Sequence, residues 1–173
     1  MKTPIVLTII SEDHPGIVNT VSEVLYKHDG TWTESSMATL AGQFAGILLA
    51  SVASDKADAC IEELQALRDQ GIHVIAHASR DKPAPAIETR EYALDLVGND
   101  RRGIVHDITA ILARFDVNVH DLETVVESVA MGGGEVFKAR AKLTIPLNVD
   151  IEALEAELED MANELMVDIR LEH

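Results

Sequence analysis

Aromatic residues, cysteine and basic residues are all scarce in this chain of 173 residues. Aromatic residues make up 3% of the sequence, Cys60 is the one cysteine, and 14 Lys and Arg stand against 30 Asp and Glu. One cysteine excludes an internal disulfide framework and fits a reducing compartment, so we expect a cytoplasmic protein. The N-terminal run IVLTII predicts a first strand and lacks the features of a signal peptide. No apolar run approaches the roughly 20 residues of a membrane-spanning helix, and we expect no membrane contact.

The net charge of −16 is spread over both halves of the chain. Residues 1–86 carry 11 acids and 6 basic residues, a net of −5, and residues 87–173 carry 19 acids and 8 basic residues, a net of −11. Neither half therefore offers the basic surface that nucleic-acid binding usually requires. We expect no direct nucleic-acid binding, so that any role in gene regulation passes through another protein.

The chain repeats itself at an offset of 87 residues. The stretch SEDHPGIVNT (11–20) aligns with GNDRRGIVHD (98–107), and residues 5–34 match residues 92–121 at seven identical positions. These pairs are Leu7/Leu94, Asp13/Asp100, Gly16/Gly103, Ile17/Ile104, Val18/Val105, Leu25/Leu112 and Asp29/Asp116. A repeat of this length indicates two copies of one structural unit.

Each copy predicts the order strand, helix, strand, strand, helix, strand. In the first copy the predicted strands are 4–10, 31–40, 43–54 and 72–79, and the helices begin near Pro15 and span 57–70. In the second copy the strands are 92–98, 117–128, 135–145 and 166–172, and the helices are 104–115 and 151–165. This order predicts an α+β fold of two ferredoxin-like βαββαβ units, each a four-stranded antiparallel sheet with two helices on one face.

Composition places a boundary between the two copies. The stretch 80–90 is rich in proline and charge and is predicted to be a linker between domains at 1–79 and 91–173. A second short stretch, MGGGE (131–135), predicts a hairpin tip between the middle strands of the second copy.

Unrelated functions share the βαββαβ unit, so the fold alone does not decide among them. An RNA-recognition module stacks bases on aromatic residues of its sheet, and the runs QFAGILLASV and EVFKARAKL lack the required aromatic pair. An acylphosphatase-like hydrolase holds a phosphate with an arginine in its first loop. Arg101 and Arg102 stand there in the second copy, but His14 and Pro15 in the first. We keep the hydrolase as the less favoured alternative, since two arginines at a helix start are also typical of a solvated corner.

Other residues with reactive side chains show no catalytic or metal-binding spacing. Cys60 is expected to face the core. His73 and His77 share one face of a predicted strand but lie roughly 13 Å apart, which is too far for one metal ion. We therefore assign no catalytic residue, no metal and no cofactor, and expect a protein that is not an enzyme.

The first repeat resembles a known family. A strand that runs into D-x-P-G-I-V and then a helix is similar to the ACT domain, a small regulatory module that binds amino acids. The string DHPGIVNTVSEVL, the S-x-M-A-x-L run at 35–40 and the tandem layout further resemble the glycine cleavage system transcriptional repressor family. This resemblance implies a small amino-acid ligand such as glycine, and repression of the glycine cleavage operon through a DNA-binding partner, a LysR-type transcriptional activator. An ACT adaptor that regulates a metabolic enzyme directly is the alternative.

The helix start after the first strand is the candidate ligand site. Its residues are Asp13, His14, Pro15, Gly16, Ile17 and Val18. The first turn of a helix leaves N–H groups unpaired and favours an anion, so we expect a ligand carboxylate against the amides of Gly16–Val18. Asp13 and Glu34 are the candidate partners for the ligand's ammonium group.

The second copy offers a companion corner. Its residues are Asp100, Arg101, Gly103, Ile104 and Val105. By the resemblance, Asn118 supplies a polar side chain to a site in a paired ACT unit, where the first copy has Thr31. Two simpler interpretations stay open: Asp13 and Asp100 cap their helices, and the corner glycines serve only tight helix packing. We also expect a homodimer, because open sheet edges favour a symmetric partner.

Overall fold

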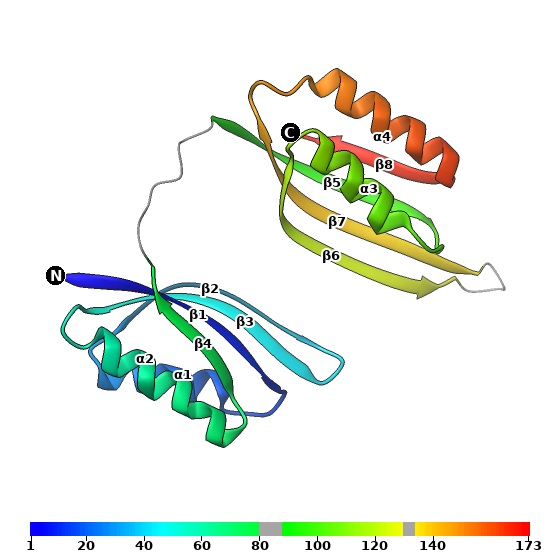
Figure 1. The fold of residues 1–173 in the computed structure, drawn as a ribbon. Coiled ribbons are helices and arrows are strands. Elements are labelled where there is room, and N and C mark those ends of the chain that lie inside the picture. The colour runs from blue at the N-terminus through cyan, green and yellow to red at the C-terminus, as the bar shows by residue number, and fades with distance from the viewer. Residues whose placement is uncertain (80–87, 130–133) are drawn as a thin grey trace. The chain divides into compact units, whose positions relative to one another are not determined.

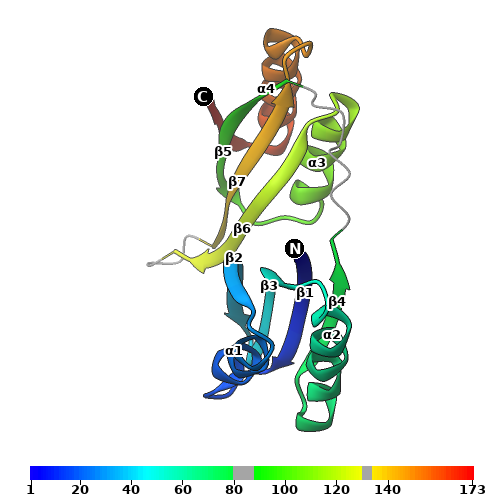
Figure 2. The same ribbon diagram turned by 90° about the vertical axis from the view of Figure 1, so that its left-hand side faces the viewer.

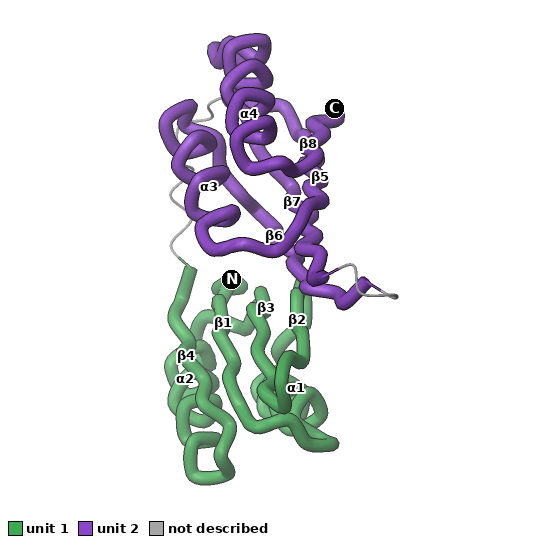
Figure 3. Tube along the Cα trace, turned by 90° about the vertical axis from the view of Figure 1, so that its right-hand side faces the viewer, with its two compact units in different colours: residues 1–83 green, residues 84–173 purple. Residues whose placement is uncertain are grey.

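The computed structural model describes residues 1–79, 88–129 and 134–173. The chain divides into two compact units, unit 1 over residues 1–83 and unit 2 over residues 84–173 (Figure 3). Most of the predicted linker, 80–87, and most of the predicted hairpin tip, 131–133, lie outside the described residues. The last two residues of that predicted linker, Thr89 and Arg90, belong to the first strand of unit 2.

Both units have the predicted order of elements. Unit 1 consists of β1 (Lys2–Glu12), α1 (Ile17–Lys27), β2 (Thr31–Leu40), β3 (Gln43–Ala53), α2 (Ala57–Ala66), a 3-10 turn (Leu67–Gln70) and β4 (His73–Ala78). Unit 2 consists of β5 (Thr89–Asn99), α3 (Ile104–Arg114), β6 (Asn118–Ser128), β7 (Glu135–Pro146), α4 (Ile151–Leu165) and β8 (Val167–Glu172). The predicted helix over 57–70 is therefore an α-helix that tightens into a 3-10 turn before Gly71.

Each unit forms one antiparallel sheet of four strands. The strand order is β2-β3-β1-β4 in unit 1 and β6-β7-β5-β8 in unit 2. Within each unit both helices lie on the same side of the sheet (Figures 1 and 2). This arrangement confirms the predicted fold class of two ferredoxin-like units.

Each unit has its own hydrophobic core between its sheet and its helices. In unit 1 alternate residues of β1, Ile5, Leu7 and Ile9, meet the apolar faces of α1 and α2, to which Val21 and Leu64 belong. In unit 2 the equivalent β5 residues, Leu94 and Leu96, meet Ile108, Leu158 and other residues of α3 and α4. Side chains alternate between the two faces along a strand and recur every 3.6 residues along a helix. The apolar residues at these spacings in the sequence are therefore the ones that face the core.

The backbone repeats at the same offset as the sequence. Gly16 and Gly103 have φ angles of 101° and 103°, and Asp29 and Asp116 both have a φ angle of 54°. A bulge follows at matching places, where the strand register shifts between Trp32 and Glu34 in β2 and between Val119 and Asp121 in β6. The duplication therefore extends to local backbone details that composition does not reveal.

Candidate ligand site

The predicted corner of unit 1 connects the end of β1 to the start of α1. The chain leaves β1 at Glu12, turns through residues 13–16 and enters the helix at Ile17. The amide of Asp13 donates a hydrogen bond of 2.9 Å to the carbonyl of Gly42 at the β2–β3 turn, which ties the corner to that hairpin. Asp13, His14, Pro15 and Gly16 are all exposed, as is Val18, whereas the side chain of Ile17 is buried in the core.

Backbone conformation, and not close packing, explains the glycine at each corner. The φ angles of Gly16 and Gly103 lie in a region that residues with a side chain rarely adopt. A β-carbon at Gly16 would have no neighbour within 4 Å, and one at Gly103 would have only Oδ2 of Asp107 at 3.5 Å, an ordinary contact. The interpretation that these glycines serve tight helix packing is therefore wrong.

The helix starts at both corners are uncapped by side chains. The N-cap residues are Gly16 and Gly103, and no side chain accepts a capping hydrogen bond at either position. In α1 the first intrahelical bond runs from the amide of Thr20 to the carbonyl of Gly16, at 2.8 Å. The amides of the three preceding helical residues therefore have no acceptor within the helix. Since Asp13 and Asp100 do not cap their helices, that interpretation is also wrong.

The corner of unit 2 differs from that of unit 1 in its charges. Asp107 replaces Thr20, and its carboxylate lies beside Gly103 and 3.0 Å from Nδ1 of His106. The guanidinium of Arg101 donates to the carbonyl of Leu165, at 3.3 Å, and so engages the C-terminal end of α4. A carboxylate of the protein itself thus stands at the helix start of unit 2. Of the other predicted residues there, Asp100 and Val105 are exposed and Ile104 is buried.

Two predicted site residues lie far from the corner of their own unit. Glu34 pairs with Leu49, which pairs with Val6, six residues before the end of β1 and thus about 20 Å from the corner. Asn118 pairs with Thr144, opposite Glu91, eight residues before the end of β5, which corresponds to about 27 Å. The structure does not bring Glu34 to the Asp13 corner. A role for Asn118 at a corner requires a second ACT unit, as the sequence suggested.

The bulge in β2 also places Glu34 on the face of the sheet that carries no helix. Because the register shifts at Thr33, Trp32 pairs with buried Ala50 and packs on the core, while Glu34 pairs with Leu49 on the opposite face. Simple alternation along the strand does not reveal this switch of face.

Cys60 and His28 carry reactive side chains, and both lie in surroundings that fit a role in the fold. Cys60 is 0% exposed, and burial raises the pKa of its thiol to about 11. His28 lies 2.8 Å from a carboxylate oxygen of Glu63, between α1 and α2. Within the described ranges, no three His, Cys, Asp or Glu side chains gather as a metal site would require, and no helix is long and apolar enough to cross a membrane.

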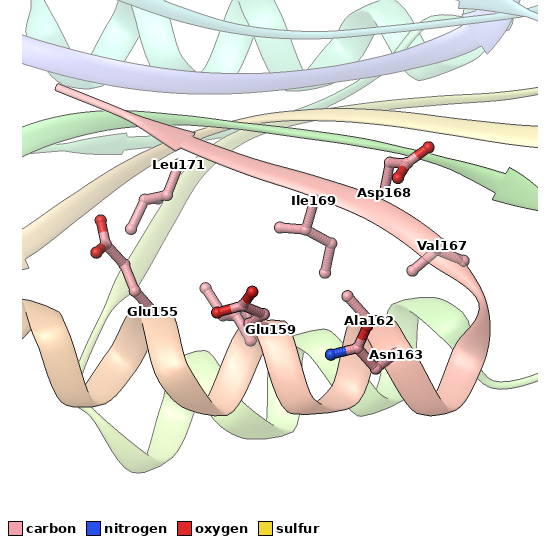
Figure 4. A pocket seen from close by; sticks show the side chains of 9 residues that line it. Glu155, Glu159, Ala162, Asn163, Val167, Asp168, Ile169 and Leu171 are labelled. Atoms are coloured by element: carbon pink, nitrogen blue, oxygen red, sulfur yellow. The ribbon is translucent and has the colours of Figure 1, made fainter.

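A groove of about 380 Å³ lies between α4 and β8 (Figure 4). Leu158 and Ile169 line it, together with two carboxylates of α4, those of Glu155 and Glu159. Like charge in this groove would repel a ligand carboxylate.

Comparisons with known proteins agree with the duplicated fold. A family model described as the ACT domain matches residues 3–76 and 94–172. A solved structure of an unknown protein from Galdieria sulphuraria is 28% identical, with a TM-score of 0.90 over 99% of this chain and 98% of that one.

A second solved structure, described as a "putative glycine cleavage system transcriptional repressor", is 16% identical, with a TM-score of 0.66 over 99% of this chain and 96% of that one. At that identity the likeness concerns the fold alone. No curated protein matches the chain significantly. Because the family model covers most of both units, this chain belongs to the ACT domain family, with two ACT domains in tandem.

Proposed function

We propose that this chain is a non-enzymatic sensor of a small amino acid, and that the corner Asp13–Val18 of unit 1 is its binding site. The observation that carries the proposal is the uncapped start of α1 within an ACT domain, exposed beside a glycine that brings no side chain. A ligand carboxylate fits against the amides of Ile17 and Val18, where the helix dipole favours an anion. The exposed carboxylate of Asp13 is the partner for the ligand's ammonium group.

The two corners are expected to differ in affinity. In unit 2 the carboxylate of Asp107 stands beside Gly103, and it repels the carboxylate that a ligand would bring. Arg101, which could have offset that charge, engages the end of α4. We therefore assign the stronger site to unit 1 and a weaker one to unit 2. Asn118 of another ACT unit supplies a further polar side chain to the ligand site.

Glycine is the first ligand to test, and the proposed output is repression of glycine cleavage operon transcription in the cytoplasm. The motif DHPGIVNTVSEVL and the tandem layout support this assignment, as does a fold shared with the repressor-like structure. A net charge of −16 opposes direct binding to DNA, so the output passes through a DNA-binding partner, a LysR-type activator.

Calorimetric titration with glycine and the other common amino acids tests the ligand site. Wild-type protein is expected to bind at least one small amino acid. Asp13→Asn should weaken that binding about 10- to 100-fold, because it removes a hydrogen bond between charged groups worth about 1.5–3 kcal/mol. The matched variant Asp100→Asn should leave the stronger site unchanged. Absence of heat with every amino acid, or equal binding by Asp13→Asn, would contradict the proposal.

Affinity capture with the ligand present and absent tests the output. Recovery of a LysR-type regulator supports the repressor assignment. Recovery of a metabolic enzyme in its place supports the adaptor alternative, with the ligand site unchanged. The hydrolase alternative predicts turnover of an acyl phosphate that Arg101→Ala abolishes, and we expect no such turnover.

A further inference from the structure

The two sheets differ on the face that carries no helix, here called the outer face. In each unit both helices cover the other side of the sheet (Figures 1 and 2). An antiparallel sheet with one bare face ordinarily presents polar residues to water on that face. Sheet β6-β7-β5-β8 follows this rule, and sheet β2-β3-β1-β4 departs from it.

Strand register defines the outer-face residues position by position. In unit 1 three rows run across β2, β3, β1 and β4: first Glu34, Leu49, Val6 and His77, then Ser36, Ile47, Thr8 and Ile75, then Ala38, Ala45, Ile10 and His73. In unit 2 the equivalent rows are Asp121, Lys142, Ala93 and Glu172, then Glu123, Arg140, Asp95 and Arg170, then Val125, Lys138, Val97 and Asp168. Asp, Glu, Lys and Arg thus take one of twelve positions in unit 1 and nine of twelve in unit 2.

The charges on the unit 2 face pair with one another. Nε of Arg140 lies 2.9 Å from Oδ1 of Asp95, and Nζ of Lys142 lies 3.7 Å from Oδ2 of Asp121. Such pairs between exposed side chains are typical of a surface in contact with water. The unit 2 face is therefore compatible with contact with water and does not require a partner.

The unit 1 face exposes large aliphatic side chains. Ile10 is 48% exposed, Ile47 is 59% exposed and Ile75 is 64% exposed, and the less exposed Val6 and Leu49 lie beside them. Single exposed apolar residues are ordinary, but a contiguous patch marks an interaction site. This patch spans three neighbouring strands at the centre and edge of the sheet.

We propose that the outer face of the unit 1 sheet is a homodimer interface, on which the same face of a second copy packs. A charged surface would lose hydration against this face without finding partners, so its complement is apolar. Of the two outer faces in the described part of the chain, the unit 1 face alone is apolar. A two-fold axis supplies that complement, because an isologous interface pairs a surface with itself. The interface differs from the sheet edges considered above and does not rest on ligand binding.

The size of the face suits a dimer. Its strands contain 11, 10, 11 and 6 residues. At a rise of about 3.4 Å per residue and a strand spacing of about 4.8 Å, they present a flat footprint of about 600 Å². The accessible area of a ridged surface exceeds its footprint, and a standard interface buries about 800 Å² on each partner.

Two of the five polar side chains on the face are also placed for self-association. Glu34 stands in the β2 edge and His77 in the β4 edge of the same row. A two-fold axis that runs along the strands, between β1 and β3, sets β2 of one copy over β4 of the other. Glu34 then lies opposite the partner's His77, and by symmetry His77 lies opposite the partner's Glu34.

The molecular mass in solution tests the interface. By light scattering on a sizing column, the wild-type protein is expected at twice the mass of the 173-residue chain. Ile47→Arg with Ile75→Arg should give the mass of one chain, because it buries two guanidinium groups on each side. Unit 2 carries Arg140 and Arg170 at these positions, so the sheet tolerates both substitutions. Val97→Arg, on the unit 2 face, is the matched control and should remain dimeric. A monomeric wild type, or a folded double variant that stays dimeric, would overturn the proposal.

Cysteine labelling gives a second test with a milder substitution. Cys60 is fully buried, so a single introduced thiol can be followed by its reaction with a maleimide. Ile75→Cys should react at least several-fold more slowly at high protein concentration than at low, whereas Val97→Cys should react equally at both. A rate for Ile75→Cys that does not depend on protein concentration would contradict the interface.

Discussion

Gly16 and Gly103 share a backbone conformation that residues with a side chain adopt only at a cost. Their φ angles, 101° and 103°, turn the chain from a strand into a helix with no side chain over the first amides. Since space around Gly16 is open, the conformation alone selects glycine there. The same residue therefore serves the fold and keeps the proposed ligand site accessible.

Gly16→Ala tests the role of this glycine in the fold. We expect the free energy of unfolding to fall by about 1–2 kcal/mol, because the alanine methyl group disfavours a positive φ. Tyr26→Ala, at a residue of α1 that is 85% exposed, should change stability by no more than about 0.5 kcal/mol. Urea unfolding followed by circular dichroism measures both. A Gly16→Ala variant as stable as the wild type would show that φ at this position is not constrained.

Cys60 is expected to be chemically silent in the folded protein. Burial, with a smaller contribution from the carboxylate of Glu63, raises the pKa of its thiol to about 11. Because the thiolate is the reactive form, a disulfide reagent at neutral pH should label Cys60 slowly in the native state and rapidly in denaturant. Equal rates in both states, with a small free thiol as the reference, would place Cys60 outside the core.

At the level of elements, α1 and α2 are held together by a charged contact at their exposed edge. Glu63 on α2 accepts from Nζ of Lys27 at 2.8 Å and lies 2.8 Å from Nε2 of His28. The hydrogen bond to Lys27, the largest cause, and the one to His28 lower the pKa of the Glu63 carboxyl below its ordinary value of 4.5. The contact therefore favours the folded state while the carboxylate is charged.

The pH dependence of stability tests this contact. A carboxyl whose pKa is lowered on folding stabilises the native state above its ordinary pKa, and the contribution is lost as pH falls through the lowered value. Glu63→Gln should thus be less stable than the wild type at pH 7, and the difference should shrink below about pH 4.5. Glu62→Gln, an exposed neighbour on α2, should differ little at any pH. A Glu63→Gln deficit that persists in acid would assign the effect to packing.

Sequence patterns predict the elements well because their signals are local. The periodic apolar residues of 151–165 identify α4 to the residue, and the repeat identifies matching strands in both units. Helix 57–70 was harder at its end, since the change to a 3-10 turn at Leu67 depends on how α2 meets β4.

Features of the candidate site that depend on tertiary contacts were beyond the sequence. The bulge at Thr33 moves Glu34 to the outer face, and no residue pattern marks it. Arg101 reaches a carbonyl 64 residues away in the chain, at the end of α4. Asp107, by contrast, was visible as an acid in the first turn after Gly103, and comparing it with Thr20 in the other copy would have signalled the difference between the corners.

For the molecule as a whole, duplication has produced two units with alike cores and unlike surfaces. The buried residues form two clusters that share no member, one for each sheet. The inner faces are apolar in both copies, whereas the outer face is mostly charged in unit 2 and exposes large aliphatic side chains in unit 1. We infer that the two copies have different roles. Unit 1 carries the proposed ligand site and the proposed dimer interface, and unit 2 presents a charged surface to water.

Paired core substitutions test whether the units are also separate in stability. Leu7 and Leu94 are equivalent positions at the centres of the two cores, 0% and 2% exposed. Truncating either to alanine should cost about 2–5 kcal/mol, the loss expected for a buried leucine whose cavity only partly closes. Because the clusters share no residue, Leu7→Ala should raise amide hydrogen exchange within residues 2–78 and leave residues 89–172 unchanged, and Leu94→Ala should do the reverse. If either substitution raises exchange equally in both ranges, the two ACT domains unfold as one cooperative body, and a ligand at the unit 1 corner would then stabilise unit 2 as much as unit 1.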